Sequence, residues 1–217
     1  MFNLIINISI SQLNYYYFHL GFSSKHSNNL LKKYFLGNYY NNTIINLNYS
    51  IFFLKISLNI ILSVLLKNGR LLLFSENNNF IDFKEKYLFK FFKIYFCFKR
   101  WYPGLLTYFK NFLKFKNLKN KIYLFSIPDL ILVLSYKNYY TIGNLSKEMK
   151  KLLIPSINLI DTISNPMYMD YFILLNLKNL YSIFFYLKFI KQILLKSIFL
   201  KKKLFLKKLI FLILKFI

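Results

Sequence analysis

Short apolar runs alternate along the chain with longer segments of helical length. The run "TIINL" at 43–47 is followed by "RLLLFS" (70–75), "IYFCF" (94–98), "DLILVLS" (129–135), "SINLID" (156–161) and "DYFILLN" (170–176). Strands that are apolar at nearly every position are typical of a sheet covered on both faces. The pattern therefore predicts an α/β fold, doubly wound, with a mainly parallel sheet and helices on both of its faces.

The segments between these runs predict the helices. We expect helices over 50–67, 77–92, 144–153 and 178–196. Gly69 follows the first and is typical of a helix C-cap, while Pro155 stops the third. Functional residues of such a sheet gather beyond the carboxyl ends of its strands, which places 75–79, 99–101, 135–138 and 161–166 near one edge.

The chain of 217 residues suits one domain with an appendage. We assign 1–196 to the α/β domain and 197–217 to a lysine-rich tail. The tail carries six lysines among apolar residues, so we expect it to dock on a partner. No stretch forms a clean membrane span of about 20 apolar residues. The N-terminus lacks the features of a signal or transit peptide, which suggests synthesis inside any organelle where the protein works.

The composition points to an anionic partner. The formal net charge is +24 with only seven acids, and all basic residues except Arg70 and Arg100 are lysine. An extremely AT-rich genome explains the abundant lysine but not the scarcity of acids. Nucleic acid and an anionic membrane surface are the usual partners of such a charge. One cysteine, Cys97, and two histidines favour neither a disulfide framework nor a metal centre, and we expect no cofactor.

A basic segment surrounds the rare residues of "KRWYPGLLTYFKNF" at 99–112. Pro103 and Gly104 predict a sharp turn. Trp101 either stacks on a nucleic-acid base or anchors the end of the third strand in the core. The guanidinium of Arg100 can hold a phosphate through two hydrogen bonds. The candidate nucleic-acid contacts of this segment are Lys99, Arg100, Trp101, Lys110, Lys114, Lys116, Lys119 and Lys121.

Several motifs, in order, resemble the bacterial-type small-subunit ribosomal protein two family. They are "HLGF" (19–22), "KKYFLG" (32–37), "TIINLNYS" (43–50), "KNGRLLLFSEN" (67–77), "RWYPGLLTYFK" (100–110), "IPDLILVLS" (127–135) and "IPSINLIDTISNPMYMDYFILLN" (154–176). The resemblance covers roughly 10–195 and implies a parallel α/β protein bound to ribosomal RNA and neighbouring small-subunit ribosomal proteins. Its structural motif positions are His19, Gly21, Pro103, Gly104, Thr107, Pro128, Asp129, Pro155, Asp161, Thr162 and Pro166.

Some of these positions have a second interpretation. His19 contacts RNA or lies in a turn packed against the sheet, and Asp161 is expected to hold a turn rather than an anion. Lys25, Lys32 and Lys33 contact phosphates or form a solvated basic loop. The chain also departs from the family, since Phe22 replaces a histidine and Tyr102-Pro103 replaces Leu-Gly. The family's helical hairpin is shortened or absent, because only 110–127 are available for it.

The resemblance, the codon bias and the absent transit peptide together predict a mitochondrially encoded protein of the small ribosomal subunit, in the mitochondrial matrix. The sequence contains no nucleotide-binding glycine loop, nucleophile elbow or acid–base pair, so we expect no enzymatic activity. Two alternatives remain. One is a mitochondrially encoded, membrane-associated subunit with a basic amphipathic tail, and the other is a free RNA-binding protein that acts in maturation.

Overall fold

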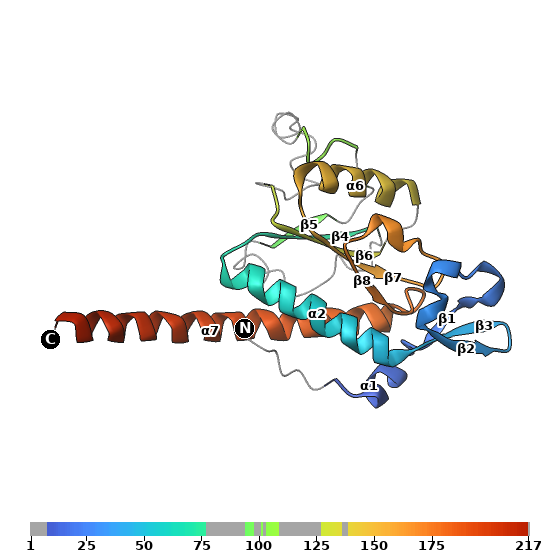
Figure 1. The fold of residues 1–217 in the computed structure, drawn as a ribbon, viewed down its shortest axis with the longest axis horizontal. Coiled ribbons are helices and arrows are strands. Elements are labelled where there is room, and N and C mark those ends of the chain that lie inside the picture. Colours follow the sequence, from blue (N-terminus) through green and yellow to red (C-terminus); the bar gives the residue numbers. More distant parts are fainter. Residues whose placement is uncertain are drawn as a thin grey trace.

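The computed structural model describes residues 8–76, 94–97, 101, 103–108, 127–135 and 139–216. Its centre is a parallel five-stranded sheet in the order β5-β4-β6-β7-β8 (Figure 1). The strands are β4 (Leu71–Ser75), β5 (Ile94–Cys97), β6 (Leu130–Ser135), β7 (Ser156–Ile160) and β8 (Tyr171–Leu174). All four pairings are parallel, which confirms the predicted parallel sheet. The expected helix over 77–92 lies outside the described residues.

Helices cover both faces of this sheet, as the continuous apolar strands predicted. The helices α2 (Leu47–Leu66) and α7 (Leu180–Phe216) lie on one face, and α6 (Tyr139–Leu152) lies on the other (Figure 1). Successive residues of β4 alternate between the two cores. Leu71 and Leu73 pack with α2 and α7, whereas Leu72 and Phe74 pack with α6. Every residue of the strand is therefore buried, which explains its apolar sequence.

A separate antiparallel sheet corrects the assignment of "TIINL". It contains β1 (Leu20–Ser23), β2 (Phe35–Tyr39) and β3 (Asn42–Ile45) in the order β1-β3-β2. The apolar pattern predicts 43–47 as the first strand of the parallel sheet, and this prediction is wrong. The residues instead pair with β1 and β2, because Tyr40 and Asn41 join β2 to β3 in a tight hairpin. Short 3-10 turns complete the fold, namely η1 (Ser24–His26), η2 (Asn29–Tyr34) and η4 (Pro166–Tyr168).

The ends of α2 differ from the prediction. The helix begins at Leu47, where the side chain of Asn46 accepts the backbone N–H of Asn48 at 3.1 Å. Asn68, not Gly69, adopts the left-handed conformation after the helix, with φ 59°. The N–H of Gly69 then donates to the carbonyl of Val64 at 2.9 Å, the bond that closes a Schellman motif. Gly69 is needed because a Cβ there would collide with Val64.

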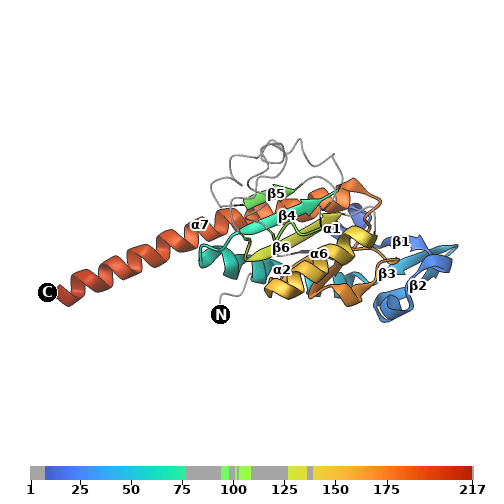
Figure 2. The same cartoon turned by 90° about the horizontal axis from the view of Figure 1, so that it is seen from above.

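One helix of the described residues, α2, is long and apolar enough to cross a membrane. The core helix of a soluble domain passes the same criterion, and α2 buries Leu54, Leu58, Ile61 and Leu65 against the sheet and α7. The other long helix, α7, continues without a break past Ser197, where the predicted tail begins. Its C-terminal part projects away from the rest of the domain (Figures 1 and 2).

Candidate nucleic-acid interface

The acidic residues are confined to the middle of the chain. All seven lie between Glu76 and Asp170, so residues 1–75 and 171–217 contain none. Four of the acids in the described part accept backbone N–H groups within the fold. They are Asp129 (from Arg70, 2.8 Å), Glu148 (from Gly104 and Leu106), Asp161 (from Thr162 and Leu177) and Asp170 (from Ser156, 2.9 Å). These four carboxylates are therefore acceptors for backbone N–H groups of the fold.

The two acid-free segments meet in space. We call residues 8–75 and 171–216 the acid-free segments; they form α1 (Ile10–Tyr15), the small sheet, α2 and α7, together with β4 and β8. Among the side chains that the structure describes there, the exposed lysines are Lys25, Lys32, Lys33, Lys55, Lys67, Lys178, Lys188, Lys202 and Lys203. A surface that carries only positive charges attracts a polyanion, and without such a partner its charges repel one another. This part of the molecule is therefore the best candidate for an RNA interface.

Only some of the predicted RNA contacts can be placed. The side chain of Lys25 is exposed in η1, and those of Lys32 and Lys33 are exposed in η2. All three belong to the first acid-free segment. The ammonium of Lys33 also lies 5.0 Å from the ring centre of Tyr34. The remaining basic candidates, Lys99, Arg100, Lys110, Lys114, Lys116, Lys119 and Lys121, lie outside the described residues, as does most of the shortened hairpin region.

Trp101 is not available for stacking on RNA, which corrects one of its two predicted roles. Its side chain is only 2% exposed and packs edge-on against Phe74, with 5.5 Å between the ring centres. The indole N–H donates to Glu148 at 3.2 Å. The alternative role, an anchor in the core, agrees with this geometry.

The turn after Trp101 binds the same carboxylate. The N–H of Gly104 donates to one Glu148 oxygen at 2.6 Å, and the N–H of Leu106 donates to the other at 2.9 Å. Gly104 has φ 87°, a left-handed conformation that glycine adopts without strain. Pro103 and Thr107 belong to the same turn, with Pro103 exposed and Thr107 half-buried. Sequence reasoning missed Glu148, and its position among seven scarce acids was the only available signal.

The loop after β7 fastens the small sheet to the parallel sheet. The hydroxyl of Thr162 accepts the N–H of Phe22 at 2.9 Å, and the carbonyl of Thr162 accepts the N–H of Asn28 at 2.8 Å. Gly21 lies so close to this loop that a Cβ would collide with Thr43 and Thr162. Gly21, Phe22 and Thr162 therefore belong to one packed junction, although 140 residues separate Phe22 from Thr162. His19 lies in the turn before β1, where its carbonyl accepts the N–H of Ile45 at 2.8 Å.

Asp161 holds the start of this loop, in agreement with its predicted role. One carboxylate oxygen accepts the N–H of Thr162 at 2.7 Å, and the other accepts the N–H of Leu177 at 3.2 Å. Burial raises the pKa of this carboxyl from 3.8 to about 6, although the two N–H groups and the charge of Lys178 oppose the change. Burial likewise lowers the pKa of the His19 imidazole, whose Nδ1 has no hydrogen-bond partner in the described residues.

The remaining motif residues mark the ends of strands. Pro128 is buried before β6, and Asp129 pairs with the backbone of Arg70 at the start of β4. The carbonyl of Pro155 accepts the N–H of Ile131 at 3.1 Å. Pro166 begins η4, which Asn165 caps. The contacts of these residues hold the fold together rather than join them to the exposed lysines.

The described residues contain no group of three or more potential metal ligands. The fold is a parallel α/β domain with a strongly basic, acid-free part. A comparison with family models matches this chain to ribosomal protein S2 over residues 16–122 and 113–197, which is well over half of its length. The chain therefore belongs to the ribosomal protein S2 family, a family of ribosomal proteins without enzymatic activity.

A curated relative supports this assignment. The chain is 28% identical over 190 residues to the small ribosomal subunit protein uS2m of Acanthamoeba castellanii. The alignment includes 86% of this chain but 57% of the relative, so this chain spans little more than half of that protein's length.

Proposed function

We propose that the protein is a structural constituent of the small subunit of the mitochondrial ribosome, where it binds ribosomal RNA and neighbouring ribosomal proteins. The family match over 16–197 carries the ribosomal part of this proposal. The likeness to a mitochondrial uS2m protein supports the location in mitochondria. The excess of amino acids with AT-rich codons supports synthesis from the mitochondrial genome.

The charge distribution supports RNA as the principal partner. In the described part of the chain, four acids accept backbone N–H groups, and several lysines are exposed at the surface. Lysine ammonium groups bind phosphates with little base specificity, which suits a protein held by a folded RNA. We propose Lys25, Lys32 and Lys33 as phosphate contacts, and the basic residues of 99–121 as a second group that includes Arg100.

Co-sedimentation tests the proposal. The protein should migrate with the small mitochondrial subunit in salt that removes loosely bound proteins, and nuclease treatment should release it. Its recovery only from free or membrane fractions would contradict a ribosomal role. A nuclease-sensitive particle smaller than the subunit would instead support the alternative of a free RNA-binding protein in maturation.

The membrane alternative has two observations in its favour. The apolar helix α2 meets the criterion for a span, and α7 ends in a projecting lysine-rich segment. Extraction of mitochondrial membranes with carbonate distinguishes the two functions. A membrane-associated subunit stays with lipid after ribosomes are removed, whereas a ribosomal protein does not.

A further inference from the structure

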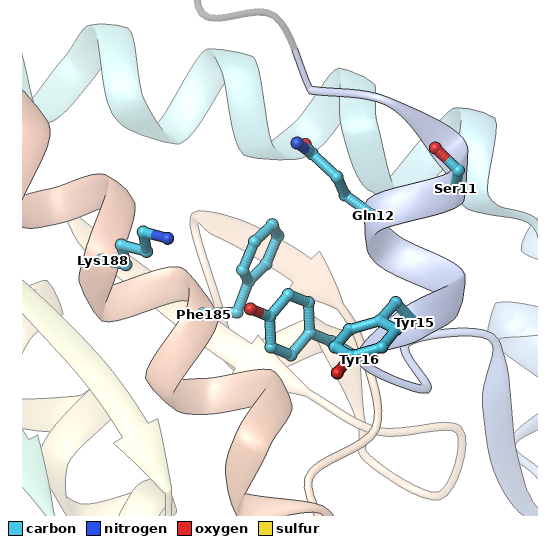
Figure 3. A pocket seen from close by; sticks show the side chains of 6 residues that line it. All are labelled: Ser11, Gln12, Tyr15, Tyr16, Phe185 and Lys188. Carbon is cyan, nitrogen blue, oxygen red and sulfur yellow. The ribbon is translucent and has the colours of Figure 1, made fainter.

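A pocket of about 360 Å³ lies between α1 and α7, which belong to the two acid-free segments. Its lining residues are Ser11, Gln12, Tyr15, Tyr16, Phe185 and Lys188 (Figure 3). The volume falls in the usual range for small-ligand sites, about 300–1,000 Å³. None of the sequence motifs pointed to this place, because its two walls are about 170 residues apart in the chain.

The walls of the pocket are fastened to each other. The hydroxyl of Ser182 donates to the carbonyl of Tyr16 at 2.7 Å, and the side-chain amide of Asn176 donates to the carbonyl of Tyr17 at 3.3 Å. The rings of Tyr16 and Phe185 stack at 4.2 Å between centres, with 25° between their planes. The pocket therefore exists before any partner binds, and little ordering is needed to fill it.

Three kinds of group face this space. The ring of Tyr15 is 78% exposed and stands edge-on to Tyr16. Gln12 and Lys188 extend toward the Phe185 ring from α1 and α7 (Figure 3). An exposed aromatic ring, an amide and an ammonium group match the three parts of a nucleotide, namely the face of the base, its polar edge and the phosphate.

We propose that this pocket binds one unpaired nucleotide of RNA, with its base stacked on Tyr15 and its phosphate near Lys188. The inference rests on the proposed function, because it takes RNA as the partner. A base inside a duplex is already stacked and cannot enter, so the ligand is a single-stranded residue. The absence of acids from both segments removes the repulsion that a phosphate would otherwise meet.

The proposal is tested by measuring how two oligomers of equal length and charge bind to the full-length protein. One is a short labelled oligouridylate, and the other is an abasic ribose-phosphate oligomer. Tyr15→Leu should weaken binding of oligouridylate about ten-fold, in line with the loss of one stacked base, and leave the abasic strand unaffected. Lys188→Gln should weaken the binding of both strands and reduce the slope of log affinity against log salt concentration by about 0.7.

Matched variants control for general effects. Tyr171→Leu removes another exposed tyrosine, on β8, and Lys147→Gln removes an exposed lysine on α6, outside the acid-free segments. Equal affinities of Tyr15→Leu and the unmodified chain for oligouridylate would overturn the pocket proposal while RNA binding stands. Failure of the unmodified chain to bind either strand would overturn the proposed function as well. Cross-linking of 4-thiouridine should map to α1, and mapping elsewhere would contradict the pocket.

Discussion

Trp101 and Glu148, which lie 47 residues apart, share a buried hydrogen bond of 3.2 Å. The same carboxylate receives the N–H groups of Gly104 and Leu106, so a single side chain of α6 fixes the turn that follows Trp101. Glu148 is 7% exposed, and its charge is compensated by three N–H donors. The tryptophan and glycine of this segment are therefore explained by the acceptor they share.

Replacing Glu148 should destabilise the fold. In Glu148→Gln an amide nitrogen replaces one oxygen, so a buried N–H of the turn loses its acceptor. We expect a loss of about 2–3 kcal/mol in the free energy of unfolding, measured by urea denaturation. Lys147→Gln, at an exposed neighbouring position, should change it by less than about 0.5 kcal/mol. Equal urea midpoints for Glu148→Gln and the unmodified chain would show that the turn does not depend on this carboxylate.

Gly21 should not tolerate a side chain. In Gly21→Ala the new Cβ meets Thr43 and Thr162, which also hold the backbone of Phe22 through hydrogen bonds. We expect a loss of about 1–3 kcal/mol, typical of overpacking. Gly143→Ala is the control, since nothing lies within 4 Å of a Cβ there. In the helix α6 it should stabilise by about 0.5–1 kcal/mol. Thermal unfolding of the two variants should therefore move in opposite directions.

The stability should depend on pH through Asp161. Its pKa is about 6 in the fold and near 3.8 when unfolded, so between these values the native state holds a proton that the unfolded chain releases. The free energy of unfolding should fall by roughly 3 kcal/mol from this group as pH rises from about 4 to 6, and then level off. Asp161→Asn should lack this component in denaturation measured across the window. Identical pH profiles would contradict the assignment.

Salt dependence should identify which lysines face RNA. Replacing Lys25, Lys32 and Lys33 by glutamine should reduce the slope of log affinity against log salt by about two, if each contacts one phosphate. The matched triple variant of Lys147, Lys150 and Lys151 lies on α6, on the opposite face of the sheet from α2 and α7, and should change the slope little. The reverse result would move the RNA interface to the α6 face.

Substitution of Arg100 tests whether the basic segment 99–121 contacts RNA. We expect Arg100→Glu to prevent incorporation into the ribosomal subunit while the isolated protein still folds, because the change reverses a charge that we propose binds an RNA phosphate. Arg100→Lys should recover incorporation only in part, since lysine lacks the planar fork that binds a phosphate twice. Incorporation of Arg100→Glu at the normal level, measured by co-sedimentation, would show that the position does not contact RNA.

Much of the architecture followed from the hydropathy of the strands. A run such as Leu71–Ser75 has no polar face, so it requires cover on both sides and a place inside a parallel sheet. The same reasoning wrongly assigned β3 to the parallel sheet, because its composition is also apolar. Its pairing partners are β1 and β2 of the small antiparallel sheet. Hydropathy reports how much of a strand is buried, whereas its pairing depends on the connections at either end.

The candidate site was predicted less completely. The surplus of lysines and the exposed positions of Lys25, Lys32 and Lys33 agree with a polyanion-binding surface. Trp101 was ambiguous because an aromatic residue beside a basic one suits both a core and an RNA base. The pocket between Tyr15 and Lys188 gave no local signal, since neither wall forms a motif alone.

The sequence by itself determined the class of fold, the excess positive charge and the confinement of all acids to residues 76–170. These properties follow from composition and from short-range periodicity. Only the tertiary structure decided that Trp101 faces Glu148, that Gly21 meets Thr162, and that the two acid-free ends of the chain come together around one pocket. Those contacts join residues 47 to about 170 positions apart, and such distances are set by how the layers pack rather than by any neighbouring residue.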